Sequence, residues 1–223
     1  MKKNLLALAF LVGLLTCCKS EDAPIKPVKP TDPGSINKEY MSRAETTFAN
    51  IFKYYWSDKV RMMFGSYPNT LGTPQEPSSP DYDSHAYLWG LGSVVSAFNA
   101  IVQNTDNVDF RMTYESRLKE TLLKYYNTTK EPMCFGCFVN PHDQRLYDDA
   151  IWVGIDLADL YSKTKDSWYL DYAKSVWNFV LSGKDDELGG GVYWDENAKD
   201  SKNTCSNAPA VVLALKLYQI TND

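Results

Sequence analysis

Two adjacent carboxylates, Asp148 and Asp149, stand directly before an apolar segment of the chain. Neighbouring negative charges repel each other, which favours keeping one of the two protonated, and low dielectric at a helix start strengthens this preference. One carboxylate and one protonated acid are what retaining glycoside hydrolysis requires, because the anion attacks the anomeric carbon and the acid protonates the departing oxygen. The competing interpretation is a solvated helix start that the helix dipole favours.

The elements that position this pair are predicted to be helical, in six segments. Three segments are amphipathic at helical spacing, with charges on one side only. They span residues 38–56, 110–126 and 167–181. The other three are apolar nearly all round, which predicts burial on most sides. They span residues 86–102, 150–161 and 208–218. The helices therefore alternate between outer and inner positions.

Three hairpins of outer and inner helices resemble an α/α toroid, in which a ring of inner helices is surrounded by outer ones. The predicted fold class is all-α, an (α/α)6 toroid of which this chain holds about three hairpins. A full ring needs six hairpins, so we expect either half a toroid or a fragment of a longer chain. The alternative is an ordinary six-helix bundle.

Polar and aromatic residues collect where the inner helices are predicted to begin. In a toroid these starts share one end of the ring, which predicts a polar, aromatic-lined mouth over an apolar floor. The alternative is that some of these residues are N-caps. The polar groups lie within residues 81–85, 142–149 and 194–207.

Several residues of this mouth are candidates for binding sugar. Aromatic rings can stack on sugar rings, and core packing is the alternative, which we favour for Trp152. The aromatic candidates are Trp89, Tyr147, Trp152 and Trp194. Polar side chains can hydrogen-bond sugar hydroxyls, and helix capping is the alternative for the two asparagines. The polar candidates are Asp195, Lys202, Asn203 and Asn207.

Charge and cysteine spacing exclude several other classes. The net charge is −5 without a basic cluster, which argues against nucleic acid and is compatible with a neutral glycan. Cys134 and Cys137 form a lone C-x-x-C, whereas a zinc site needs two more ligands and the chain has only His85 and His142. A local disulfide or two packed thiols are the remaining interpretations. We expect neither a metal nor a cofactor.

Three motifs then occur in order along the chain: Ala86-Tyr87-Leu88-Trp89, Leu146-Tyr147-Asp148-Asp149-Ala150-Ile151-Trp152, and Gly190-Gly191-Val192-Tyr193-Trp194-Asp195 with Lys202-Asn203-Thr204-Cys205-Ser206-Asn207. Together they resemble glycoside hydrolase family 76, the endo-α-1,6-mannanases. The resemblance implies an (α/α)6 toroid that hydrolyses α-1,6-linked mannan with retention and without a metal. It also implies that Asp148 is the nucleophile and Asp149 the acid/base.

Two other functions are also compatible with the sequence. The domain of that family is about twice as long, so a non-catalytic glycan-binding lipoprotein derived from such an enzyme is one alternative. Another α/α-toroid sugar enzyme is the second. An epimerase would need several histidines at the mouth, and a glycuronyl hydrolase would need basic residues for the uronate, for which Arg145 and Lys202 are the candidates.

The first residues resemble the export signal of a bacterial lipoprotein. Lys2 and Lys3 precede an apolar run of about a dozen residues, too short to span a bilayer. Cys18 is the predicted lipidation site, with Cys17 as the alternative, and ordinary secretion is the competing interpretation. We therefore expect a signal peptide over 1–17, a Pro-rich tether over 18–35, and the N-terminal half of a toroid catalytic domain over 36–223. The predicted location is the outer membrane or cell surface, with the membrane contacted through the lipid alone.

Overall fold

The computed structural model describes residues 38–68, 85–139 and 144–223. The chain divides into two units, Met1–Ser35 and Ile36–Asp223, and every described residue belongs to the second. The predicted signal peptide, the lipidation candidates Cys17 and Cys18, and the tether lie outside the described residues and stay predictions. The same holds for residues 81–84 and 142–143 of the predicted mouth.

Six α-helices account for most of the described chain, and the all-α prediction is confirmed. Five of them extend beyond the segments predicted at one or both ends. Most notably, the fourth begins at Tyr147 and not at Ala150, so that it includes both carboxylates. The helices are α2 (Lys38–Tyr55), α3 (Leu88–Asn104), α4 (Val108–Tyr125), α5 (Tyr147–Thr164), α6 (Ser167–Ser182) and α7 (Thr204–Thr221).

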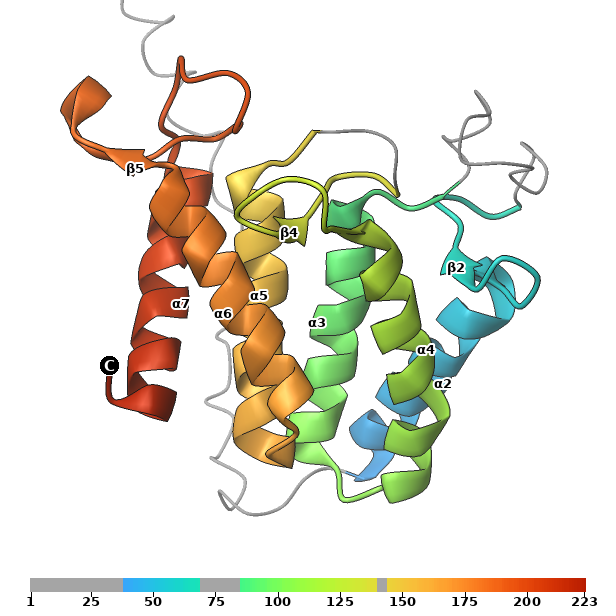
Figure 1. Cartoon of the computed structure of the whole chain (residues 1–223). Coiled ribbons are helices and arrows are strands. Elements are labelled where there is room, and N and C mark those ends of the chain that lie inside the picture. Colours follow the sequence, from blue (N-terminus) through green and yellow to red (C-terminus); the bar gives the residue numbers. More distant parts are fainter. Residues whose placement is uncertain (1–37, 69–84, 140–143) are drawn as a thin grey trace, which may run out of the picture. The chain divides into compact units, whose positions relative to one another are not determined.

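Each of the helices α2, α4 and α6 is followed by a short antiparallel hairpin that leads toward the next helix. The strands are β1 (Trp56–Ser57) with β2 (Met62–Met63), β3 (Tyr126–Asn127) with β4 (Cys134–Phe135), and β5 (Lys184–Asp185) with β6 (Gly191–Val192). A short 3-10 helix, η2 (Glu187–Gly189), lies between β5 and β6. Figure 1 shows these hairpins at the end of the helices where α3, α5 and α7 begin. The predicted common end for the inner helices is therefore observed.

Helix α5 is the centre of the packing, since α3, α6 and α7 all pack against it. Its residues from Ala150 to Leu160 are buried except for Trp152 and Asp159. Helices α2, α4 and α6 bury one side each, as amphipathic outer helices should. The predicted alternation of outer and inner helices is thus found in the structure.

Helix α7 is less covered than its sequence predicts. Leu213 and Leu217 are buried, whereas Val211, Leu215 and Tyr218 on other sides of the helix are exposed. The described elements that pack on α7 are α5, α6 and β6. Its apolar character is therefore matched by burial on one side alone.

Polar side chains cross-link the three inner helices within this apolar packing. Asn99 of α3 donates a hydrogen bond to Asp156 of α5 at 2.9 Å, and Ser96 donates to the same carboxylate. Farther along α5, Asp159 pairs with Lys216 of α7. Because a buried polar group without a partner is costly, these bonds fix how the helices are aligned along their axes. No described helix is long and apolar enough to cross a membrane.

Helix α5 packs closely against its neighbours at Gly154. A Cβ atom there would lie 2.9 Å from Val176 of α6 and 3.1 Å from Leu213 of α7. Replacing a helical glycine by alanine favours the helix by about 1 kcal/mol, but overpacking costs about 1–3 kcal/mol. We expect Gly154→Ala to lower the free energy of unfolding in urea.

Gly90 is the matched control, because it lies in α3 with only Ala86 Cβ nearby, at 3.7 Å. Gly90→Ala should leave the stability unchanged or raise it by up to about 1 kcal/mol. If Gly154→Ala were as stable as Gly90→Ala, the close packing of α5, α6 and α7 would not hold.

Candidate active site

The two carboxylates lie in the first turn of α5, and backbone contacts fix where that turn begins. Tyr147 N–H donates to the carbonyl of Trp194 at 3.0 Å, and Leu146 forms an isolated β-bridge with Asp195. The N-cap residue Leu146 offers no side-chain hydrogen bond. Asp148 and Asp149 are therefore the second and third residues of the helix and do not act as its N-cap.

Asp148 is held by the loop that follows β6. The indole N–H of Trp194 donates to Asp148 Oδ2 at 3.2 Å. The other oxygen, Oδ1, is buried and has no hydrogen-bond partner among the described residues. One oxygen is thus fixed by Trp194, while the other is buried without a hydrogen bond.

Asp149 lies in a more protected place. Burial raises the pKa of its carboxyl, the charge of Asp148 raises it further, and a hydrogen bond with Cys137 opposes both, for a pKa of about 6. An ordinary aspartate has a pKa near 4. The pair therefore retains one proton, on Asp149, at mildly acidic pH.

The loop that carries Trp194 depends on glycine. Gly189, Gly190 and Gly191 all have φ between +87° and +93°, a region that side chains with a Cβ avoid. At Gly191 a Cβ atom would also lie 2.4 Å from Asn207 Oδ1. The Gly-Gly motif thus permits a tight approach of this loop to the start of α7.

Asn207 and Lys202 were predicted to bind sugar, and in the structure both side chains form hydrogen bonds with this loop. Asn207 Oδ1 accepts from Val192 N–H at 2.8 Å, and its Nδ2 donates to the carbonyls of Val192 and Asn203 at 2.9 Å. Lys202 Nζ donates to the carboxylate of Asp185 at 2.5 Å and to the carbonyls of Asp185 and Glu187. Both residues therefore position the loop, and their predicted contacts with sugar stay predictions.

Tyr147 also differs from its prediction as a stacking platform for sugar. Its ring is buried and stacks on Phe179 with ring centroids 4.3 Å apart. Gly183 lies so close that a Cβ atom there would fall 2.2 Å from the ring. Tyr147 therefore packs the start of α5 against α6 and cannot face a ligand.

The three tryptophans have the exposure that a stacking role requires. Trp89, Trp152 and Trp194 are 56%, 41% and 36% exposed. Trp89 and Trp152 line a hollow of about 150 Å³ between α3 and α5, together with Gly92, Ser93 and Ser96. Core packing was the favoured interpretation for Trp152, and its exposure shows that this was wrong. Trp152 lies one helical turn after Asp148, on the same face of α5.

Asp195 and Asn203 lie on either side of this region. Asp195 accepts hydrogen bonds from Asn197 N–H at 2.8 Å and from Gln144 Nε2 at 3.4 Å. Asn203 is the N-cap residue of α7 but makes no side-chain capping bond. Their predicted contacts with sugar stay predictions.

Three residues near the pair were not among those predicted to bind or cleave mannan. Arg145 is fully buried and pairs with Glu196 through Nε at 2.8 Å. Burial raises the pKa of the Cys137 thiol and the charge of Asp149 raises it further, while Cys205 lies in the first turn of α7. Burial raises the pKa of the Cys205 thiol, and the neighbouring carboxyl of Asp148 raises it further. The C-x-x-C spacing marked Cys137 as unusual, but no local signal linked it to Asp149.

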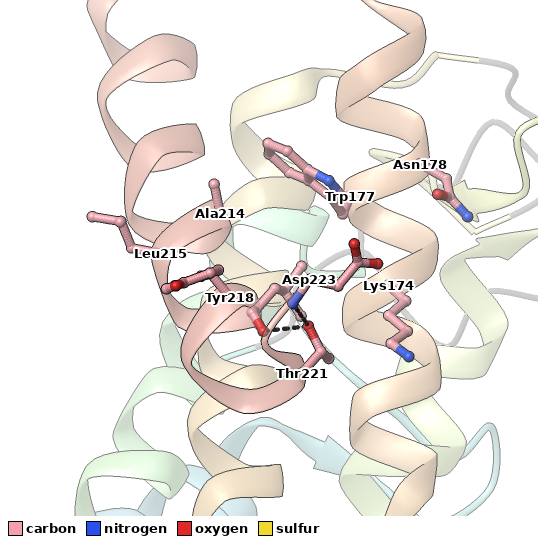
Figure 2. Close-up of a pocket in the computed structure, with 9 residues that line it drawn as sticks. Lys174, Trp177, Asn178, Ala214, Leu215, Tyr218, Thr221 and Asp223 are labelled. Carbon is pink, nitrogen blue, oxygen red and sulfur yellow. Dashed lines mark hydrogen bonds between the residues drawn. The ribbon is translucent and has the colours of Figure 1, made fainter.

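No group of three or more His, Cys, Asp or Glu side chains in the described ranges could hold a metal ion. A hollow of about 520 Å³ between α6 and α7 contains none of the predicted site residues. Figure 2 shows residues that line it, among them Trp177 and Lys174 on α6 and Ala214 and Tyr218 on α7.

The raised pKa of Asp149 predicts a pH dependence of stability. A carboxyl whose pKa is higher in the folded state contributes stability fully below its unfolded pKa, near 4, and loses it as the pH rises through about 6. Asp149→Asn removes the ionisation. We therefore expect this variant to gain up to ~2 kcal/mol in unfolding free energy relative to wild type between pH 4 and pH 8.

The charge of Asp148 provides a second arm for this measurement. Because that charge raises the pKa of Asp149, Asp148→Asn should move the loss of stability to lower pH. Urea unfolding at several pH values measures both effects. An identical pH dependence in wild type and Asp149→Asn would contradict the raised pKa.

Comparison with known proteins identifies the family of this chain. The sequence matches glycosyl hydrolase family 76 over residues 39–223. A family 76 glycoside hydrolase from a bovine Bacteroides thetaiotaomicron strain is similar in structure, with 30% identity and a TM-score of 0.70 over 82% of this chain and 39% of that one. A family 76 mannosidase from Bacteroides thetaiotaomicron has 25% identity and a TM-score of 0.69, over 83% and 49%. No curated protein sequence matches the chain.

A third solved structure is similar in fold and contains a ligand. It is an inactive variant of an α-1,6-mannanase from Salegentibacter, with two consecutive aspartates replaced, in complex with α-1,6-mannotetraose; identity is 22% and the TM-score 0.59, over 82% and 46%. This chain therefore spans less than half the length of each of the three. Its described helices form three hairpins of the (α/α)6 toroid fold, as the sequence predicts. Because the match covers residues 39–223, the chain belongs to glycosyl hydrolase family 76.

Proposed function

We propose that this protein hydrolyses α-1,6-mannosidic linkages with retention, using Asp148 as nucleophile and Asp149 as acid/base. The observation that carries the proposal is the asymmetry of the pair. Asp148 accepts an indole hydrogen bond on one oxygen only, and the pKa of Asp149 is raised to about 6. A retaining glycosidase needs an anion and a protonated acid side by side.

The reaction then proceeds in two displacements. Asp148 attacks the anomeric carbon while Asp149 gives its proton to the glycosidic oxygen, which releases the alcohol and leaves a mannosyl ester on Asp148. Asp149, now an anion, takes a proton from water, and the water oxygen displaces Asp148 from the anomeric carbon. The dipole at the N-terminus of α5 favours the anionic state of the carboxylates.

The substrate class follows from the surroundings and from the relatives. Exposed tryptophans next to the pair suit stacking on neutral sugar rings, and the mild net charge of −5 suits a neutral glycan. One structural relative is described as an α-1,6-mannanase with a bound α-1,6-mannotetraose. We infer mannan as the partner, and the lipoprotein signal with Cys18 extends the proposal to an outer-membrane or cell-surface location.

A uronate-recognising toroid enzyme fits less well. Arg145 and Lys202 were the basic residues available for a uronate carboxylate. Arg145 is fully buried against Glu196, and Lys202 is committed to Asp185. Neither cation is available to a ligand, so the neutral mannan is the better substrate.

Alanine variants of the two carboxylates should separate their roles. We expect Asp148→Ala to lose at least about 10³-fold in turnover on every mannoside, because no covalent intermediate can form. Asp149→Ala should lose about 10²–10⁴-fold on α-1,6-mannan. On an activated aryl mannoside, whose leaving group needs no proton, its first step should be affected much less. Reducing-end release, phenolate absorbance and the anomer formed first provide the measurements.

Asp186→Ala is the matched control, since Asp186 is an exposed carboxylate between β5 and η2. It should retain wild-type activity. Mannan binding without turnover by the unaltered protein would contradict hydrolysis and favour a non-catalytic glycan-binding protein. Equal activity of Asp148→Ala and wild type would remove the nucleophile assignment.

The tryptophan hollow gives a separate prediction for binding. Trp89→Ala and Trp152→Ala should each weaken the affinity for α-1,6-mannan oligosaccharides by about tenfold, the size expected from losing one aromatic contact. Tyr40→Ala, at an exposed aromatic of α2, serves as the control. Titration calorimetry with Asp148→Asn measures binding without turnover, and unchanged affinity in both tryptophan variants would exclude the hollow from the substrate site.

A further inference from the structure

The side chain of Trp194 has a different environment from the other two tryptophans near the carboxylates. Trp89 and Trp152 line the hollow between α3 and α5, and Trp194 is not among the residues that line it. The indole N–H of Trp194 instead donates to Asp148 Oδ2 at 3.2 Å. A stacking platform offers the face of its ring to a ligand, whereas here the N–H edge of the ring is directed at a carboxylate. The polar contact that the structure gives Trp194 is therefore with the proposed nucleophile.

The backbone of Trp194 is joined to the residue that begins α5. Its carbonyl accepts from the N–H of Tyr147 at 3.0 Å, and Tyr147 directly precedes Asp148. Its own N–H donates to the carbonyl of Ser201 at 3.1 Å. Both backbone polar groups of Trp194 are thus satisfied, one of them by the helix that carries Asp148. The side chain starts from a fixed point, which favours a single placement of the indole N–H.

The residues on either side of Trp194 are held as well. Tyr193 is buried, and its N–H donates to the carbonyl of Gly183 at 3.1 Å. The N–H of Glu196 donates to the carbonyl of Arg145 at 3.2 Å, in the segment that leads into α5. Because hydrogen bonds fix the backbone before and after Trp194, the folded chain itself presents the indole to the first turn of α5.

The carboxylate of Asp148 depends on this indole for its orientation. Its other oxygen, Oδ1, is buried and accepts no hydrogen bond from the described residues. A carboxylate that is held by one oxygen cannot rotate freely about its Cβ–Cγ bond. Orientation matters for a nucleophile, since a misplacement of roughly 1 Å can cost about a hundredfold in rate.

We propose that Trp194 is the positioning residue of Asp148, its indole N–H holding the carboxylate in the orientation from which it attacks the anomeric carbon. The inference rests on the proposed function for the role of Asp148 as nucleophile, but the hydrogen bond can be tested without turnover. Trp194 acts on the sugar through Asp148 and not as a stacking platform. Removal of its N–H should therefore change the rate of the reaction and not the affinity for the glycan.

The first test is the indole ¹H–¹⁵N NMR spectrum of the whole protein. Asp148→Ala removes the acceptor, so we expect the Trp194 indole proton to move upfield, toward the position of a solvent-exposed indole. This arm leaves Trp194 itself unaltered. The indole of Trp56 donates to Asp58 at 2.9 Å in the hairpin of β1 and β2, and its signal is the internal control, which should not move. An unmoved Trp194 signal in Asp148→Ala would overturn the inference.

Trp194→Phe provides the second readout, because it keeps an aromatic ring and removes the N–H. We expect its kcat on α-1,6-mannan to fall by about 10–100-fold. Its affinity for mannan oligosaccharides, measured by calorimetry in the Asp148→Asn background, should be unchanged. Trp56→Phe is the matched control, since it also removes an indole hydrogen bond to an aspartate but lies outside the site. It should retain the wild-type kcat.

The possible outcomes separate positioning from stacking. Wild-type kcat in Trp194→Phe, or a fall of the same size in Trp56→Phe, would contradict the positioning role. A loss of affinity that accounts for the whole loss in kcat/KM would do the same, because stacking predicts this result. If the Trp194 signal responds as expected in a protein that does not hydrolyse mannan, the hydrogen bond stands and the proposed function fails.

Discussion

The ion pair between Arg145 and Glu196 connects the two segments that build the site. Arg145 is fully buried, with its guanidinium 4.7 Å from the ring of Phe179, and Nη1 donates to the carbonyl of Pro132 at 2.6 Å. Removing one member of such a pair leaves an unpaired buried charge, at a cost of about 3–5 kcal/mol. Arg145 precedes α5 by two residues and Glu196 follows Trp194 by two. The pair therefore sets the distance from the carboxylates to the indole.

The opposite end of the same loop is held by α7 and the residue before it. Lys202 binds the β5–η2 segment, and Asn207 binds Val192 through both its N–H and its carbonyl. Between these anchors and Arg145, the loop has little freedom to move Trp194 away from Asp148. The site is accordingly assembled from α5, the β6 loop and the start of α7, which are joined by side chains and not by one continuous element.

The helices and their alternation could be predicted because periodicity is a local property of the sequence. The place of Asp148 and Asp149 at an inner-helix start followed from the same pattern. The structural roles of Tyr147, Lys202 and Asn207 could not be predicted from local periodicity. Each depends on a partner 15 or more residues away: Phe179, Asp185 and Val192. A polar residue beside a helix start has the same sequence signature whether it faces a ligand or anchors a loop. The link from Cys137 to Asp149 was hidden for the same reason.

The nearby cations form ion pairs with other carboxylates, which explains why the pair of Asp148 and Asp149 keeps a proton. Arg145 is paired with Glu196 and Lys202 with Asp185, so neither neutralises the pair. Two uncompensated carboxylates in a half-buried site cannot both ionise without a large penalty. Asp148 receives the indole N–H of Trp194, whereas burial and then the charge of Asp148 raise the pKa of Asp149. The proton therefore resides on Asp149, and the deeper burial of this carboxyl beside the charge of Asp148 gives each carboxylate its own role.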